Sequence, residues 1–212
     1  TNPLDCGPRG NLEMVFNGPS VFPEYLTDVK VIMCPSDQSA QREYDDGRYN
    51  FFHDPNQGIN PCRFSDGSYI YFGWGITDQN LYVDPSQQND TAIEAATIIS
   101  YLTPEAFDIL TNQLLAAYPL PAATDPAFPG VLDEDLSSGD VTMYRLREGI
   151  ERFFITDINN PAASTIAQSE LWVMADGVTT NASQFNHIPG GANVLYMDGH
   201  VEFLRYPSET PC

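Results

Sequence analysis

The chain has 212 residues, of which 42% are hydrophobic and 12% aromatic, so it is able to fold around a core and is not disordered. Its 9 basic and 29 acidic residues give a formal charge of −20, which excludes binding to nucleic acid or to an anionic membrane surface through clustered Lys and Arg. No stretch of about 18 apolar residues is present, so the sequence predicts no membrane-spanning helix.

Residues 1–90 are rich in Gly, Pro, Asn, Asp and aromatic side chains, which indicates short strands and ordered loops. The β-like runs in this region are 29–33 and 68–74. The second run alternates aromatic side chains, a pattern typical of a core strand and, in a second interpretation, of a carbohydrate-binding platform. These aromatic residues are Tyr69, Tyr71, Phe72 and Trp74.

The four cysteines, Cys6, Cys34, Cys62 and Cys212, lack any C-x-x-C spacing, which favours disulfides over a metal finger or a redox motif. Three pairings are open from the sequence alone. We favour Cys34 with Cys62, which leaves Cys6 with Cys212 and ties the chain ends together. The alternatives are free thiols, or a bridge from Cys6 or Cys212 to a neighbouring subunit. Disulfides predict an extracellular or cell-surface location.

Residues 90–118 predict two consecutive helices, the second of which begins at Thr103 as N-cap and Pro104 as first helical residue. Four apolar residues of this second helix recur at helical spacing and predict one core-facing stripe. They are Phe107, Leu110, Leu114 and Tyr118.

A long polar loop is predicted over 119–140. Its alternating oxygen-bearing side chains, Asp133, Asp135, Ser137 and Asp140, leave two interpretations open, a calcium-binding loop or a solvated acidic loop. The loop is not an EF-hand, because Ser138 stands where that motif requires Gly and Tyr144 stands where it requires Glu.

Three further patterns precede the C-terminus. The segment 145–152 gathers three of the basic residues beside two acidic ones, which predicts local ion pairs and, alternatively, an anion or subunit contact. A strand is expected over 171–174. Asn89 and Asn181 each begin an N-x-[ST] sequence, the acceptor pattern for N-glycosylation.

Residues 193–204 predict a β-hairpin with a two-residue turn at Asp198 and Gly199. In that register Met197 pairs with His200, and one face of the hairpin is wholly apolar and meets the core. The residues of that face are Val194, Tyr196, Val201 and Phe203.

The sequence contains none of the catalytic or nucleotide-binding motifs that have a defined spacing, so we predict no enzyme and name no catalytic residue. The histidines are His53, His187 and His200. His187 precedes a Pro-Gly-Gly turn and is expected to hold that loop by hydrogen bonds to backbone groups. A metal site formed by His187, Asp198 and His200 is a rival interpretation.

Several segments together are similar to a known family. These are 145–161, 185–203 with His187, Asp198 and Gly199, the sequence Cys-Pro-Ser-Asp at 34–37, and 62–74. They resemble bacterial pseudopilin-like, prepilin-type proteins, abundant in planctomycetes and their relatives, which carry a His and a downstream Asp-Gly near the C-terminus. Ten residues separate His187 from Asp198, one more than is usual in that family.

The resemblance implies a fold and a role. We expect a single pilin-like α+β domain over 1–212, with an antiparallel sheet packed against helices, long ordered loops, a helical insertion at about 90–118 and a C-terminal hairpin. The family's apolar N-terminal helix is absent from these residues. The implied role is a secreted structural subunit that assembles with copies of itself into an extracellular filament, tube or pseudopilus-like polymer. The alternative is an extracellular module that binds carbohydrate or another ligand. No cofactor is required, and calcium is the one candidate ion.

Overall fold

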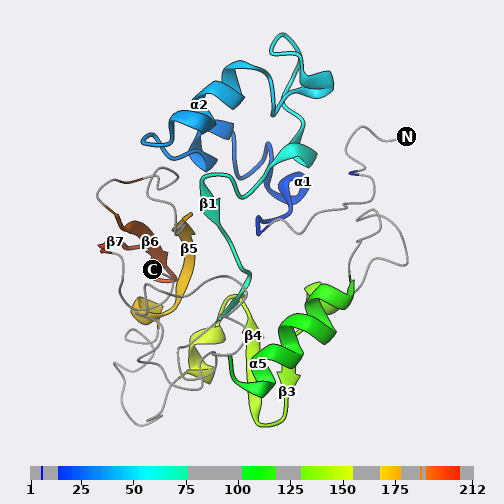
Figure 1. Cartoon of the computed structure of the whole chain (residues 1–212), viewed down its shortest axis with the longest axis vertical. Coiled ribbons are helices and arrows are strands. Elements are labelled where there is room, and N and C mark those ends of the chain that lie inside the picture. The colour runs from blue at the N-terminus through cyan, green and yellow to red at the C-terminus, as the bar shows by residue number, and fades with distance from the viewer. Residues whose placement is uncertain are drawn as a thin grey trace. The chain divides into compact units, whose positions relative to one another are not determined.

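The computed structural model describes residues 6, 14–75, 102–117, 130–154, 168–177, 187 and 190–205. Helices and two antiparallel sheets make this an α+β fold, which confirms the fold class (Figure 1). The strand order is β1-β5-β6-β7 in one sheet and β2-β4-β3 in the other.

The chain divides into two compact units, each assembled from three separate segments. Unit 1 comprises Thr1–Phe72, Tyr118–Phe128 and Asp176–Gly190, and unit 2 comprises Gly73–Ala117, Pro129–Ala175 and Gly191–Cys212. The single domain expected over 1–212 stays a prediction. Among the described residues, no helix combines the length and the apolarity needed to cross a membrane.

Short helices and loops build unit 1. Its described elements are α1 (Gly18–Val21), η1 (Val29–Ile32), α2 (Gln38–Asp45), η2 (Phe51–His53), η3 (Pro61–Arg63) and β1 (Tyr69–Ile70). Buried side chains of η1 and α2 pack together with Tyr49 and Phe64. The rings of Phe16, Phe22 and Tyr49 each meet Phe64 edge to face, which is the favourable geometry for aromatic pairs.

The β-like run at 29–33 is a 3-10 helix, η1, so the strand predicted there is wrong. The Asp28 side chain accepts a hydrogen bond from the Lys30 amide at 2.9 Å, which caps a helical turn. This local bond competes with strand pairing, and Val29 and Ile32 then bury their side chains from one side of the turn.

A disulfide joins Cys6 to Cys62 and leaves Cys34 as a buried free thiol. The favoured pairing of Cys34 with Cys62 is therefore wrong, and so is that of Cys6 with Cys212. Sequence spacing could not choose among the pairings, because the choice depends on which Cα atoms the fold brings together. Those of Cys6 and Cys62 lie 5.1 Å apart. Cys212 lies outside the described residues.

Unit 2 contains the second predicted helix. Its helical elements are α5 (Pro104–Asp108), η5 (Ile109–Leu114), η6 (Leu115–Ala117), η7 (Gly130–Leu132) and η8 (Ile150–Phe153). Thr103 caps α5 by accepting a hydrogen bond from the Ala106 amide at 3.1 Å, as predicted. The first predicted helix, before residue 102, lies outside the described residues.

The predicted apolar stripe of this helix is only partly correct. The buried positions are Ala106, Ile109 and Leu114, whereas Phe107 is 41% exposed. From Ile109 to Leu114 the helix is a π-helix, in which amides bond to carbonyls five residues earlier. The wider turn rotates the buried face relative to a regular α-helix, and a pattern with period 3.6 cannot foresee that shift.

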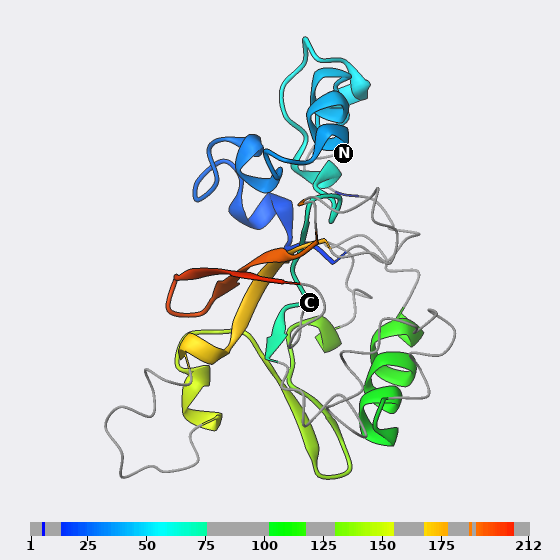
Figure 2. The ribbon, with the colours of Figure 1, turned by 60° about the vertical axis from the view of Figure 1, so that its left-hand side comes forward.

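The three-stranded sheet comprises β2 (Trp74–Gly75), β4 (Val141–Arg145) and β3 (Leu136–Ser138), and β3 and β4 form a hairpin (Figure 2). The acidic stretch predicted as a loop therefore contains a strand. The run at 68–74 is divided between β1 and β2, and Gly73 lies between them with a φ of 85°. Glycine adopts this left-handed conformation readily, so the chain turns where a continuous strand was expected.

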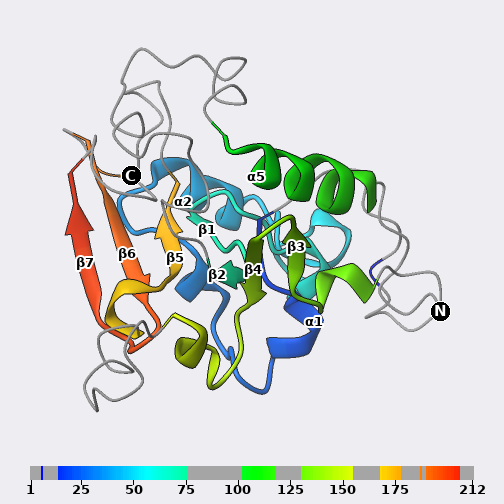
Figure 3. The same ribbon diagram turned by 90° about the horizontal axis from the view of Figure 1, so that it is seen from below.

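The strands β5 (Trp172–Asp176), β6 (Ala192–Tyr196) and β7 (Val201–Leu204) lie side by side in the other sheet (Figure 3). The expected strand at 171–174 is thus confirmed as part of β5. The predicted C-terminal hairpin is present as β6 and β7, but its register is shifted. Leu195 pairs with Val201, and the Tyr196 amide donates to the His200 carbonyl at 3.0 Å.

The shift follows from the loop of the hairpin. Met197, Asp198 and Gly199 form a three-residue loop, and only Gly199 among them has a positive φ, 89°. A type I′ turn needs two such residues, whereas a three-residue loop needs one. The predicted apolar face is therefore wrong, because a shift by one residue moves Val201 and Phe203 to the opposite face.

Candidate functional site

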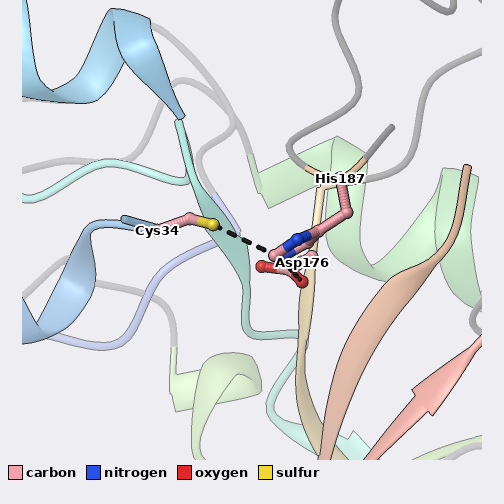
Figure 4. Close-up of side chains that lie close together, drawn as sticks. All are labelled: Cys34, Asp176 and His187. Atoms are coloured by element: carbon pink, nitrogen blue, oxygen red, sulfur yellow. Dashed lines mark hydrogen bonds and ion pairs between the residues drawn. The ribbon is translucent and has the colours of Figure 1, made fainter. Parts of the chain in front are cut away.

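Three side chains from distant parts of the sequence converge in unit 1: Cys34, Asp176 and His187 (Figure 4). His187 Nε2 lies 2.9 Å from Asp176 Oδ2 and 3.4 Å from Cys34 Sγ. One ligand atom from each residue lies within 4.8 Å of the other two. Among the described residues, this is the one cluster of three or more His, Cys, Asp or Glu side chains with such a separation.

Cys34 is positioned between two capped helical segments. It follows η1, and Asp37 caps α2 by accepting hydrogen bonds from the amides of Ser39 and Ala40. The Ser68 hydroxyl donates to the same carboxylate at 2.9 Å, which ties this turn to the residue before β1. Cys34 is therefore held at the end of a rigid turn.

The electrostatic surroundings of the Cys34 sulfur act in opposite directions. Burial raises the pKa of the thiol, and the charge of Asp176 adds to that effect. The backbone amides of Ser36 and Asp37 act in the opposite direction and lower the pKa, although the net shift is upward. At neutral pH Cys34 is thus a protonated thiol.

Asp176 and His187 complete the cluster. Asp176 ends β5 and is 1% exposed, whereas the His187 side chain is 25% exposed. The Gly177 amide donates to the Ser68 carbonyl at 3.0 Å and holds the end of this strand. His187 is thus the most exposed of the three residues of the cluster.

Tyr69 lies beside the cluster. Burial raises the pKa of its phenol to about 12, with further contributions from the charges of Cys34 and Asp176 and from a hydrogen bond to Cys34. The phenol therefore stays neutral and serves as a hydrogen-bond donor to the cluster.

The arrangement differs from a proton relay. In a nucleophile–histidine–acid triad, one ring nitrogen faces the nucleophile and the other faces the carboxylate. Here Nε2 of His187 faces both Cys34 and Asp176. A buried thiol with a raised pKa is also a poor nucleophile at neutral pH. The cluster is better suited to holding an ion than to nucleophilic catalysis.

A second candidate surface lies in unit 2. Leu195, Val201 and Phe203 share one side of the β6–β7 hairpin, and we call this surface the β7 face. Val201 is 60% exposed and Phe203 is 47% exposed. β7 ends the order of its sheet, so within the described part of the chain one of its edges pairs with no strand.

The structure does not gather the predicted calcium ligands. Asp135 accepts hydrogen bonds from the Arg145 amide and the Arg147 guanidinium, both at 2.8 Å. Ser137 lies in β3 with its hydroxyl 3.0 Å from that of Thr142. Asp133 and Asp140 are exposed on either side of β3.

Two arginines of the basic segment contact residues outside it, and the ion pairs expected within the segment stay a prediction. Arg147 pairs with Asp135, and Arg145 donates to the Gly73 carbonyl and lies over the Trp74 ring at 5.0 Å. Of the aromatic residues proposed as a carbohydrate platform, Trp74 is buried and Tyr69, Tyr71 and Phe72 are half-buried, which disfavours that alternative. Asn89 and Asn181 lie outside the described residues.

The family-motif residues occupy two places. His187 contacts the side chains of Asp176 and Cys34, and its expected hydrogen bonds to backbone groups stay a prediction. His200 Nδ1 lies 2.5 Å from Asp198 Oδ1 in the hairpin, and its ring stacks on Tyr196. The rival metal site would join His187 of unit 1 to Asp198 and His200 of unit 2, and it stays a prediction.

Sequence reasoning missed both Asp176 and the role of Cys34. Asp176 follows an apolar run, as a strand-end carboxylate does, but nothing in the sequence connects it to Cys34. Compared with known proteins, the chain matches no family, no curated protein and no solved structure.

Proposed function

We propose that the protein is a secreted structural subunit that assembles with copies of itself into an extracellular filament, tube or pseudopilus-like polymer. The observation that carries the proposal is the β7 face, where Val201 and Phe203 are exposed on a strand that ends its sheet. The resemblance of the C-terminal segments to pseudopilin-like proteins supports the same role.

An exposed edge strand is a template for pairing with another chain, because its outward N–H and C=O groups are available to a second strand. Soluble proteins often protect such edges with charged side chains. The β7 strand carries one acidic residue, Glu202, between Val201 and Phe203, both of which are more than a third exposed. We therefore assign the β7 face to contact with a second copy of this chain.

The net charge sets a condition on assembly. Copies with a formal charge of −20 repel one another, and salt at physiological ionic strength screens that repulsion beyond about 8 Å. Contacts at short range must therefore be apolar or strand-to-strand. The Cys6–Cys62 disulfide supports maturation outside the cytosol.

The test is Val201→Lys, examined by sedimentation velocity and negative-stain microscopy. The substitution changes the formal charge from −20 to −19 and so reduces repulsion between copies. If the β7 face makes the contact, the variant is nevertheless monomeric under conditions in which the unchanged protein assembles. The cost of burying an unpaired ammonium group in an apolar contact is larger than the benefit of the slightly weaker repulsion between copies.

Val31→Lys is the matched control. Val31 is 66% exposed, close to the 60% of Val201, and the substitution makes the same change in charge. It lies in unit 1, on η1, and should leave assembly unchanged. The proposal fails if the unchanged protein is monomeric at acid and neutral pH, at low and high salt, and with and without calcium.

A further inference from the structure

We propose that Cys34, Asp176 and His187 bind a divalent transition-metal ion of the zinc class. This inference does not depend on the proposed assembly, because its three residues lie in unit 1 and the β7 face lies in unit 2.

The donor set is the first argument. A cysteine sulfur, an imidazole nitrogen and a carboxylate oxygen are the ligand types that Zn²⁺ takes in proteins. Calcium and magnesium instead prefer oxygen ligands alone, so the sulfur and nitrogen select for a softer ion. The calcium loop predicted from the sequence offers oxygen ligands only. The calcium loop and the cluster around Cys34 would therefore bind different classes of metal ion.

The geometry of the three atoms is the second argument. With zinc–ligand bonds of about 2.0 Å to nitrogen or oxygen and about 2.3 Å to sulfur, a tetrahedron places sulfur and nitrogen about 3.6 Å apart, and nitrogen and oxygen about 3.3 Å apart. The separation of Cys34 Sγ from His187 Nε2 is 3.4 Å. Asp176 Oδ2 lies 2.9 Å from the same nitrogen, so that pair opens by about 0.4 Å to admit the ion.

The electrostatics are the third argument. Asp176 is 1% exposed and Cys34 is 3% exposed, so an ionised carboxylate and thiolate here require a nearby positive charge. Both of these charged groups are more favourable beside a divalent cation. Such a cation also displaces the proton of a thiol that coordinates it.

The surrounding residues complete the site. The Tyr69 phenol hydrogen-bonds to Cys34 and is suited to orienting that ligand from outside the coordination shell. Three protein ligands leave the fourth position of a tetrahedron for a water molecule or a small anion. The 25% exposure of the His187 side chain marks the side from which the ion enters.

The test uses the whole chain, freed of metal and with its disulfide intact, and Co²⁺ as the probe. Tetrahedral cobalt bound to a thiolate has strong visible bands and a sulfur-to-metal charge-transfer band, so the spectrum reports both geometry and the presence of sulfur. We expect one Co²⁺ per chain, displaced by Zn²⁺. Zinc should also raise the melting temperature, because it binds the native state.

Variants assign the ligands. Cys34→Ser should abolish the charge-transfer band, and His187→Gln should weaken binding by more than about 100-fold, beyond what loss of an outer-shell partner causes. His200→Gln is the matched control, because His200 also contacts an aspartate, Asp198, but in an exposed loop. Cys212→Ser controls for the cysteine that lies outside the described residues. Both controls should keep the spectrum of the unchanged chain.

The proposal is overturned if the unchanged chain, with Cys34 shown to be reduced, gives no thiolate–cobalt band at saturating Co²⁺. It is also overturned if Cys34→Ser keeps the band and Cys212→Ser loses it. Circular dichroism of each variant separates loss of a ligand from loss of the fold.

Discussion

The sequence favoured disulfides for the four cysteines, but Cys34 is a buried free thiol whose neighbours are a carboxylate and an imidazole. Its sulfur lies 3.4 Å from His187 Nε2, while Cys62 is bonded to Cys6. Residue type alone cannot separate a bridging from a ligating cysteine. The distinction lies in residues more than a hundred positions away, which the fold brings to the sulfur.

Asp37 shows how one side chain positions the site from outside it. Burial alone would raise the pKa of this carboxyl, but hydrogen bonds from Ser39, Ser68 and Ala40 outweigh burial and lower it. The same bonds cap α2 and attach it to the residue before β1. Loss of the carboxylate should therefore affect both the stability of unit 1 and the position of Cys34.

We predict that Asp37→Ala lowers the free energy of unfolding by about 1 to 2 kcal/mol, the usual cost of losing an N-cap. Asp37→Asn keeps a capping oxygen but loses the charge. Because the pKa of Asp37 is lower in the folded state, the charge stabilises the fold above the unfolded pKa and ceases to do so as pH falls through the folded pKa. The difference between the protein and Asp37→Asn should thus be present at neutral pH and shrink at about pH 3.

Urea unfolding at the two pH values measures both effects. Asp45→Asn removes a charge from the exposed C-terminal end of the same helix and serves as the control. A difference between the protein and Asp37→Asn that grows toward acid pH would contradict the direction assigned to the pKa of Asp37.

At the scale of elements, the hairpin shows what a pattern does and does not determine. The dipeptide Asp198-Gly199 correctly located a turn between two strands. The length of the loop depends on whether Asp198 also adopts a positive φ, and it does not. A single dihedral therefore decides which face Val201 and Phe203 occupy.

We predict that Gly199→Ala destabilises the protein by about 1 kcal/mol, because a side chain at positive φ is strained. An added Cβ at this position meets no atom within 4 Å, so the cost is conformational rather than a clash. Gly130→Ala is the control, since its Cβ also meets open space and its φ is not left-handed. Thermal unfolding of the two variants gives the comparison, and equal melting temperatures would contradict the three-residue loop.

The elements predicted best are those specified by neighbouring residues. Thr103 and Pro104 defined the start of α5, because a cap and a first-turn proline act within one helical turn. The predictions for the runs at 29–33 and 107–118 failed, wholly or in part, for other reasons. An Asp28 cap made the first a helix, and the π-helix from Ile109 moved the buried face of the second.

At the scale of the whole molecule, the candidate site could not be predicted, because unit 1 is assembled from three segments. Asp176 and His187 come from a segment far from Cys34 in the sequence, and no local period relates them. Composition did determine the formal charge of −20, because charge depends on residue counts and not on contacts.

The Cys6–Cys62 disulfide links the start of unit 1 to its core across 56 residues. By the loop-entropy relation a bridge of that span stabilises the fold by about 4 kcal/mol. We predict that the double variant Cys6→Ser, Cys62→Ser has a free energy of unfolding lower by that amount. Urea unfolding of the variant and of the unchanged protein measures the difference. Cys34→Ser breaks no bridge, so in the absence of metal its free energy of unfolding should fall by much less.

Peptide mapping without reduction decides between the pairings and bears on the metal site as well. A Cys6–Cys62 peptide confirms the bridge of the structure, whereas a Cys34–Cys62 peptide would contradict that bridge and remove Cys34 as a proposed metal ligand. The single variant Cys6→Ser sharpens the test, because it leaves Cys62 with no native partner while Cys34 remains buried. Disulfide exchange requires access to the attacking thiolate, and burial with a raised pKa denies Cys34 that role. Cys34 should therefore stay reduced in this variant, and Zn²⁺ should still bind.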